Sequence, residues 1–258
     1  MTTYQTVTAG QAHLEVLIDG SGPAVVLIPS SQRDSLHEIE FVEELAKAGF
    51  LVLRPQPRGM GRSIGPLEEI TLFDLADDIA ACIDACAGGR AVVLGHAFGH
   101  SVARVTDLRY PEKVRGVGLL AAAARQAPAH LFALLDQAAD AEDAPSLRTQ
   151  AMQLALFAPG NSTLAWAAGW YPHLRSAYRR AGATPARDIW WPVSNSPVLD
   201  LQGRLDPWRP ESSRNELRDV LGDKVSVMVV DGVSHAMLPE RPHDVARAIS
   251  SWIDGLPQ

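Results

Sequence analysis

Residues 92–104 read VVLGHAFGHSVAR, and this stretch decides how the rest of the chain is interpreted. The apolar run that ends at Leu94 has the composition of a buried strand, and residues 98–110 follow with a helix-like pattern. Gly95 and Gly99 bracket the junction, where only a tight turn connects the two elements. The segment therefore predicts strand, turn and helix, with Ala97 at the apex of the turn.

The same alternation continues on both sides of this segment. Short runs rich in Val, Ile and Leu predict strands at 24–28, 51–53, 91–94, 117–120, 197–201 and 225–230. Amphipathic stretches predict helices at 35–48, 71–87, 98–110, 211–221 and 243–253. Residues 4–8 and 13–18 have the pattern of an antiparallel edge hairpin. Alternating strands and helices predict an α/β fold with a mostly parallel sheet, and the lack of polar alternation indicates that helices cover both faces.

One region interrupts the alternation. Residues 126–195 are rich in alanine, helical in pattern and contain four tryptophans. We predict a helical cap at 126–195, inserted into a core domain made of residues 1–125 and 196–258. The tryptophans either form the core of the cap or line an apolar pocket, and Trp190 and Trp191 are the candidates for substrate contact.

Composition narrows the class of protein. The chain has 258 residues, 47% of them hydrophobic, and a net charge of −7 with scattered arginines, which argues against a nucleic-acid partner. No apolar run has the length of a membrane span and the first residues do not resemble a signal peptide, so we expect a cytoplasmic protein without a membrane partner. Cys82 and Cys86 lack the spacing of a metal or redox pair, and no phosphate loop, dinucleotide fingerprint or metal-ligand motif occurs, so we expect neither cofactor nor metal.

Four segments, taken in order, resemble the motifs of the α/β-hydrolase fold superfamily. Gly95-His96-Ala97-Phe98-Gly99 matches the nucleophile elbow G-x-S-x-G, with alanine in place of serine. Residues 54–63 resemble the glycine-rich turn that follows the fourth strand in this superfamily. Residues 25–31 resemble the end of the superfamily's third strand, with Pro29-Ser30 where its members often have His-Gly. The resemblance implies an eight-stranded sheet, and an oxyanion hole made by the amides of Ser31 and Phe98.

The fourth segment is a pair. Asp206 follows a predicted strand and His235 follows the last one, which are the places of the acid and the histidine in the superfamily's triad. A carboxylate behind an imidazole fixes its tautomer and stabilises its charged form. We also expect Ser30 and His96 to face the substrate, and Ser101, one helical turn beyond Ala97, to point away from it.

Ala97 leaves the function open among three hypotheses. Either an engineered alanine replaces the serine of an ordinary hydrolase, or alanine is natural and His235 acts as general base on water. The second case extends to non-hydrolytic acid–base chemistry, such as a lyase or a cofactor-free oxygenase. The third hypothesis is a ligand-binding protein on the same scaffold. We expect a hydrolase acting on a small, largely apolar ester, lactone or related carbonyl compound; the sequence leaves assembly into a homo-oligomer open.

Overall fold

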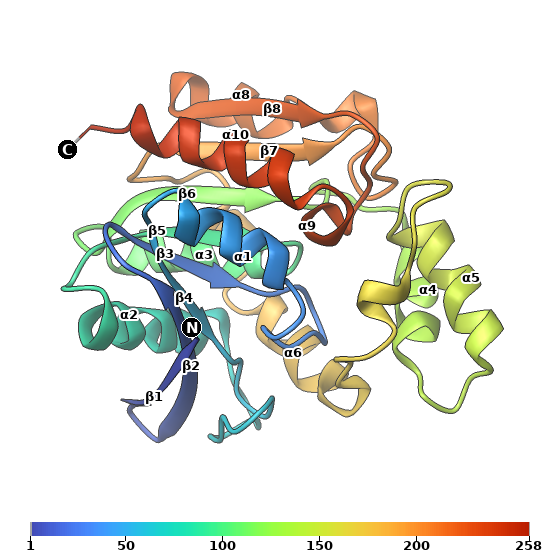
Figure 1. The fold of residues 1–258 in the computed structure, drawn as a ribbon, viewed down its shortest axis with the longest axis horizontal. Helices are drawn as coiled ribbons and strands as arrows, with labels where there is room; N and C mark the ends of the chain where they lie inside the picture. The colour runs from blue at the N-terminus through green and yellow to red at the C-terminus, as the bar shows by residue number, and fades with distance from the viewer. Residues whose placement is uncertain (1, 258) are drawn as a thin grey trace.

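The computed structural model describes residues 2–257 and contains a single eight-stranded sheet (Figure 1). The strands are β1 (Thr3–Ala9), β2 (Ala12–Gly20), β3 (Ala24–Ile28), β4 (Leu51–Pro55), β5 (Ala91–His96), β6 (Val114–Leu120), β7 (Val198–Gly203) and β8 (Val225–Val230). Their spatial order is β1-β2-β4-β3-β5-β6-β7-β8. The pairs β1–β2 and β2–β4 are antiparallel and all others are parallel. The predicted mostly parallel sheet is therefore confirmed.

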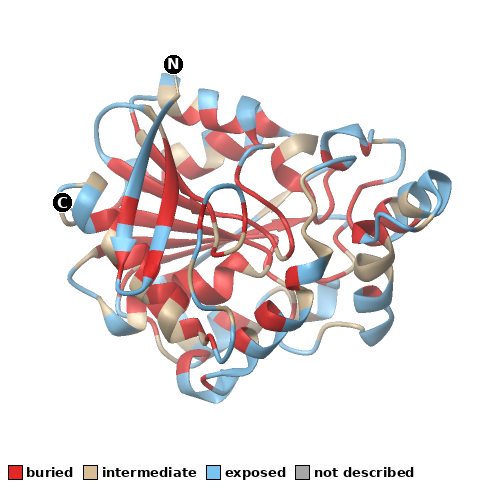
Figure 2. Cartoon of the chain, turned by 90° about the horizontal axis from the view of Figure 1, so that it is seen from below, coloured by how far each residue is buried: buried red, intermediate tan, exposed pale blue. Residues whose placement is uncertain are grey.

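Helices cover both faces of the sheet. One face packs against α1 (Ile39–Lys47) and α10 (Pro242–Asp254), the other against α2 (Leu72–Cys86) and α3 (Gly99–Arg109). Every residue of β3, β5 and β7 is buried, as the uninterrupted apolar runs predict, and the central strands are coloured as buried in Figure 2. The carboxyl ends of these parallel strands meet at one edge, which is where the loops after β3, β5 and β7 gather.

The predicted bounds of two helices were wrong. The helix predicted at 35–48 begins at Ile39, because residues 33–37 form a loop: the Ser35 amide donates to Gln56 Oε1 at 2.9 Å and the Leu36 amide to Asp34 Oδ1 at 3.0 Å. The helix predicted at 211–221 is a short 3-10 turn (Glu211–Ser213) followed by α8 (Glu216–Leu221). Side-chain hydrogen bonds of this kind compete with helix formation, and an amphipathic pattern does not reveal them.

The segment between β6 and β7 is helical, as predicted for the cap. It contains α4 (Ala129–Ala139), α5 (Pro145–Ala155), α6 (Arg175–Ala183) and α7 (Arg187–Trp190), and α4 and α5 stand beyond the end of the sheet in Figure 1. Leu131, Met152, Phe157 and Trp166 belong to a hydrophobic cluster separate from the two that flank the sheet. The bounds 126–195 for a cap domain stay a prediction.

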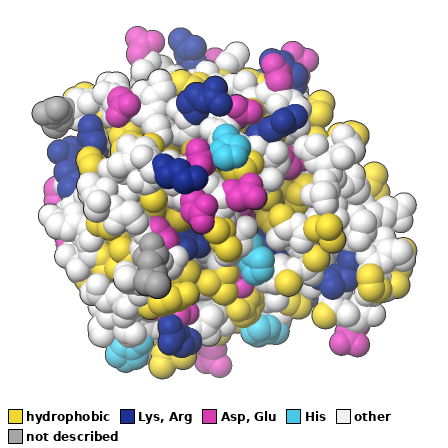
Figure 3. Space-filling model, in the orientation of Figure 1, with side chains coloured by type: hydrophobic (Ala, Val, Ile, Leu, Met, Phe, Trp, Pro, Cys, Tyr) yellow, Lys and Arg dark blue, Asp and Glu magenta, His cyan; other side chains and the backbone are white. Residues whose placement is uncertain are grey.

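The surface in Figure 3 carries acidic and basic side chains side by side, in keeping with the scattered arginines of the sequence. Among the helices formed by residues 2–257, none combines the length and the hydropathy that crossing a bilayer requires.

Candidate active site

The turn between β5 and α3 has the sharp geometry that its two glycines indicate. Ala97 adopts a left-handed backbone, with φ of 47°, and its amide donates to the Leu120 carbonyl at 2.9 Å. A Cβ on Gly95 would lie 2.2 Å from the Gly99 carbonyl oxygen, and one on Gly99 would lie 2.6 Å from the Ile28 carbonyl oxygen. Neither position accepts a side chain, so the turn itself selects both glycines.

The left-handed backbone at Ala97 gives a stability prediction. A residue with a Cβ loses about 1 kcal/mol there relative to a relaxed conformation, whereas glycine adopts positive φ freely. We expect Ala97→Gly to raise the free energy of unfolding by about 1 kcal/mol, measured by urea denaturation. Ala103→Gly, at a buried position of α3, is the control and should lower it by at least about 1 kcal/mol. A loss of stability in Ala97→Gly would contradict a strained turn.

The structure brings Asp206 and His235 together. Nδ1 of His235 lies 3.0 Å from Oδ2 of Asp206, and both side chains are buried. Oδ1 of Asp206 accepts a hydrogen bond from the Trp208 amide at 2.9 Å, and the Trp208 ring stacks on the imidazole with centroids 5.2 Å apart. Because the carboxylate accepts a hydrogen bond from Nδ1–H, the lone pair at Nε2 is free to accept a proton.

Two further groups hold the loops that carry this pair. Arg209, three residues after Asp206, forms a fully buried ion pair with Asp200 of β7 at 2.6 Å. The Glu240 carboxylate accepts from the amide of Ser234 at 2.7 Å and from the amide of Ala158 at 2.6 Å. Neither residue stood out in the sequence, because one arginine and one glutamate without a spacing pattern carry no signal.

Ala97 and His235 line one cavity of about 540 Å³ beneath α4 and α6. Ser30, Ser31 and Phe98, which we expected at the oxyanion site or in substrate contact, line it as well. Phe98 immediately precedes α3, and the amides at a helix start lack intrahelical partners, which leaves them to bind an anionic oxygen.

Four expectations for individual residues were wrong. Ser101 lines the cavity rather than pointing away, with Oγ 3.4 Å from His100 Nε2. His96, expected to face the substrate, is buried below the turn, where its Nε2 donates to the His235 carbonyl at 2.8 Å. Trp190 and Trp191 lie in the hydrophobic core next to α3, where their carbonyls accept from Arg104, and so outside the cavity lining. Packing against α3 buries both rings, and a sequence pattern does not distinguish such burial from a pocket.

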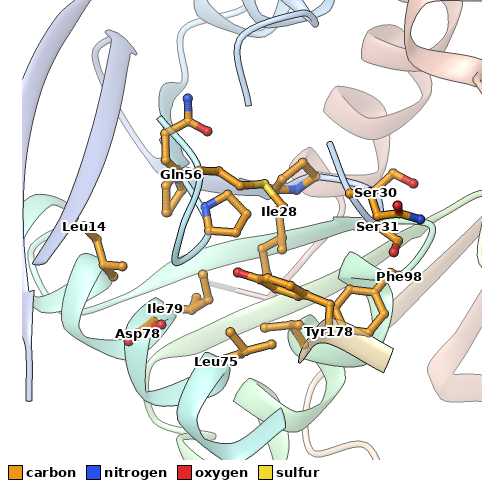
Figure 4. A pocket seen from close by; sticks show the side chains of 16 residues that line it. Leu14, Ile28, Ser30, Ser31, Gln56, Leu75, Asp78, Ile79, Phe98 and Tyr178 are labelled. Atoms are coloured by element: carbon orange, nitrogen blue, oxygen red, sulfur yellow. The ribbon is translucent and has the colours of Figure 1, made fainter. Parts of the chain in front are cut away.

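A narrow apolar recess adjoins the cavity (Figure 4). Its free volume is about 40 Å³, and Leu14, Met60, Leu75 and Ile79 contribute apolar side chains to its wall. The two spaces share five lining residues: Ser30, Ser31, Gln32, Phe98 and Tyr178. The recess therefore begins at the expected oxyanion loop and extends toward α2, which offers room for a small apolar group next to the reacting centre.

The loop after β3 is fastened to the cap by Arg33. Its guanidinium lies over the rings of Trp166 and Trp170, 4.6 and 4.7 Å from their centroids, and donates to the Ala168 carbonyl at 2.5 Å. The backbones add two bonds, from the Tyr171 amide to the Gln32 carbonyl at 2.9 Å and from the Asp34 amide to the Gly169 carbonyl at 3.3 Å. We call residues 166–171 and 32–34, joined in this way, the Arg33 clamp. The clamp was missed in the sequence, because it joins residues more than 130 positions apart.

Comparison with known proteins agrees with the fold. A family model described as the alpha/beta hydrolase fold matches residues 23–163, which is more than half of the chain. The chain belongs to the α/β-hydrolase fold family.

Among relatives of this α/β-hydrolase, a bifunctional epoxide hydrolase 2 of Sus scrofa is 35% identical over 103 residues, covering 39% of this chain and 19% of its own length. An epoxide hydrolase of Caballeronia sordidicola is 28% identical over 197 residues, covering 69% and 59%. The α/β-hydrolase thus spans less than two thirds of these curated relatives. A solved esterase from Thermogutta terrifontis has the same fold, with a TM-score of 0.79, 22% identity and 98% of each chain covered.

Proposed function

We propose that this α/β-hydrolase cleaves a small ester or lactone without a covalent intermediate, with His235 as the general base that activates water. The observation that carries the proposal is the buried hydrogen bond of 3.0 Å between His235 Nδ1 and Asp206 Oδ2, at a cavity that also contains Ala97. A ligand carrier has no need for such a pair. A general base contributes about 10²- to 10⁴-fold to the rate of such a reaction.

Ala97 supports the route without a covalent intermediate. A methyl group has no lone pair, so the apex of the turn supplies no nucleophile. The methyl side chain of Ala97 is smaller than the hydroxymethyl side chain of serine by one oxygen atom. The space that this leaves favours a water molecule beside Ala97, within reach of the His235 imidazole. Ser101 is a poor replacement, because burial lowers the pKa of its neighbour His100 to about 3 and leaves that imidazole too weak a base.

The reaction balances with residues of the site alone. His235 Nε2 takes a proton from water while the oxygen of that water forms a bond to the carbonyl carbon. The amides of Phe98 and Ser31 stabilise the oxyanion. Collapse of the tetrahedral intermediate breaks the bond to the leaving oxygen, which receives the proton from the imidazolium, and Asp206 stabilises that cation throughout. The apolar recess provides room for the acyl group.

The test is turnover of 4-nitrophenyl butyrate and γ-butyrolactone, with intact-protein mass spectrometry on acid-quenched samples. We expect steady turnover without a burst and without an acyl adduct. Ala97→Ser is the matched variant, and we expect it to accumulate an acyl adduct on residue 97. An adduct on the unaltered chain would overturn the proposal, as would activity that appears only in Ala97→Ser, which would point to a replaced serine. Tight ligand binding with no turnover in either protein would favour the binding-protein hypothesis.

A further inference from the structure

The charged side chains along the cavity are all of one sign. Arg125, Arg179 and Arg187 line it, and no aspartate or glutamate does so among the described lining residues. This contrasts with the net charge of −7 for the chain as a whole. A concave site lined by one sign of charge concentrates ligands of the opposite sign.

Two of these arginines already have counter-ions. Arg125 pairs with Asp188, and Arg179 donates to both oxygens of Asp136 at 2.9 and 2.7 Å. Arg187 instead donates to the backbone carbonyl of Arg125, and residues 2–257 place no carboxylate within 4 Å of its guanidinium. Among the described residues, Arg187 is therefore the arginine of this cavity that lacks a direct ion-pair partner.

The surroundings of Arg187 favour the binding of an anion to its guanidinium. Its guanidinium lies 6.0 Å from the Trp190 ring and 5.8 Å from the Trp191 ring, so aromatic faces replace part of its contact with water. Burial, the largest cause, and the positive charge of Arg125 lower the pKa of Arg187, and the carboxylates of Glu216 and Asp188, which favour its charged form, offset them only in part. Both causes disfavour the isolated cation and would be offset by a bound anion.

We propose that the substrate of this site carries a carboxylate, which Arg187 binds while the reacting carbonyl lies over Ala97. The inference rests on the proposed function for the reaction itself, but the binding site is defined without it. A single guanidinium without an ion-pair partner matches a planar monoanion, because its fork of N–H groups donates to both carboxylate oxygens. A phosphate monoester, with close to two negative charges, would be left with excess charge.

Binding is measured first, by calorimetry, so that the result is independent of turnover. The probes are 4-phenylbutyrate, its neutral counterpart 4-phenyl-1-butanol, and phenyl phosphate. We expect the carboxylate to bind about 10- to 100-fold more tightly than the alcohol, and Arg187→Met to remove most of that difference. Arg187→Lys, which keeps the charge but loses the fork, should lie between the two.

Arg180→Met is the matched control, because Arg180 is an exposed arginine of α6 outside the cavity lining and its loss changes the net charge equally. The control should retain the preference of the unaltered chain. An equal loss in Arg180→Met would reduce the effect to long-range charge and overturn the inference. So would equal binding of acid and alcohol, or tighter binding of phenyl phosphate than of the carboxylate.

Kinetics then separate this inference from the proposed function. The substrates are mono-4-nitrophenyl glutarate and 4-nitrophenyl butyrate, and we expect a kcat/KM preference for the first that Arg187→Met abolishes and Arg180→Met retains. If the carboxylate probe binds through Arg187 but neither ester turns over, the hydrolytic proposal fails and the carboxylate site stands. If both esters turn over equally in all variants, the hydrolytic proposal stands and the carboxylate site is refuted.

Discussion

We expect His235→Gln to lower kcat/KM for 4-nitrophenyl butyrate by about 10²- to 10⁴-fold, with most of the loss in kcat. Glutamine approximates the size of the imidazole and can still donate toward Asp206, but it cannot accept a proton from water. The measurement is initial rates at saturating and limiting substrate, with circular dichroism to verify the fold. Because the substrate is bound by other groups, KM should change little.

Asp206→Asn and His243→Gln complete this experiment. Asparagine keeps the shape at 206 but removes the charge that stabilises the imidazolium, so we expect a loss of similar order. His243 is an exposed residue of α10 that pairs with Glu44, and its replacement should leave kcat unchanged. Activity unaffected by His235→Gln would remove the general-base mechanism altogether.

A second large effect concerns stability in acid. His96 and His100 are 1% and 6% exposed, and burial lowers the pKa of each from 6.5 to about 3. The folded chain keeps both rings neutral, whereas the unfolded chain takes up protons below about pH 6.5. Their contribution to stability is complete above that pH and is lost as the pH falls toward 3. At pH 5 each ring costs about 2 kcal/mol, and the two together about 4 kcal/mol, relative to pH 7.5.

The measurement is urea unfolding at pH 7.5 and pH 5.0. Only the difference between the two pH values is compared, so a general loss of stability in a variant does not affect the result. We expect the decrease for His100→Gln to be about 2 kcal/mol smaller than the decrease for the unaltered chain. His130→Gln, which removes an exposed histidine from α4, should behave like the unaltered chain. A difference in His100→Gln as large as in the parent would contradict a neutral, buried His100.

The sequence predicted the sheet because its signal is local. An uninterrupted apolar run such as residues 24–28, followed by an amphipathic stretch, is enough to indicate a covered parallel strand and its crossover. Gly95 and Gly99 likewise report their turn directly, since each excludes a side chain through a backbone contact. Helix starts such as Ile39 were missed, because loop hydrogen bonds to distant residues decide them.

The site was predictable only where the chain follows a known motif. Asp206 and His235 were found from the strand ends that precede them, and the structure joins them. The cap offered no such guide: Trp190 and Trp191 looked like pocket residues but are buried beside α3, while Arg187, which does line the cavity, looked like any surface arginine. The packing of the cap against the core decides which side of a short helix faces a cavity. The amino-acid sequence of that helix does not reveal this packing.

The Arg33 clamp couples the position of the cap to the loop that carries Ser31. Residues 166–171 hold the loop that carries Ser31, so any displacement of this part of the cap would also shift one donor of the expected oxyanion site. A movement of residues 166–171 away from the cavity would then also displace the Ser31 amide from the expected oxyanion site. Under the proposed mechanism, activity would therefore require residues 166–171 to keep the contacts with residues 32–34 that the structure shows.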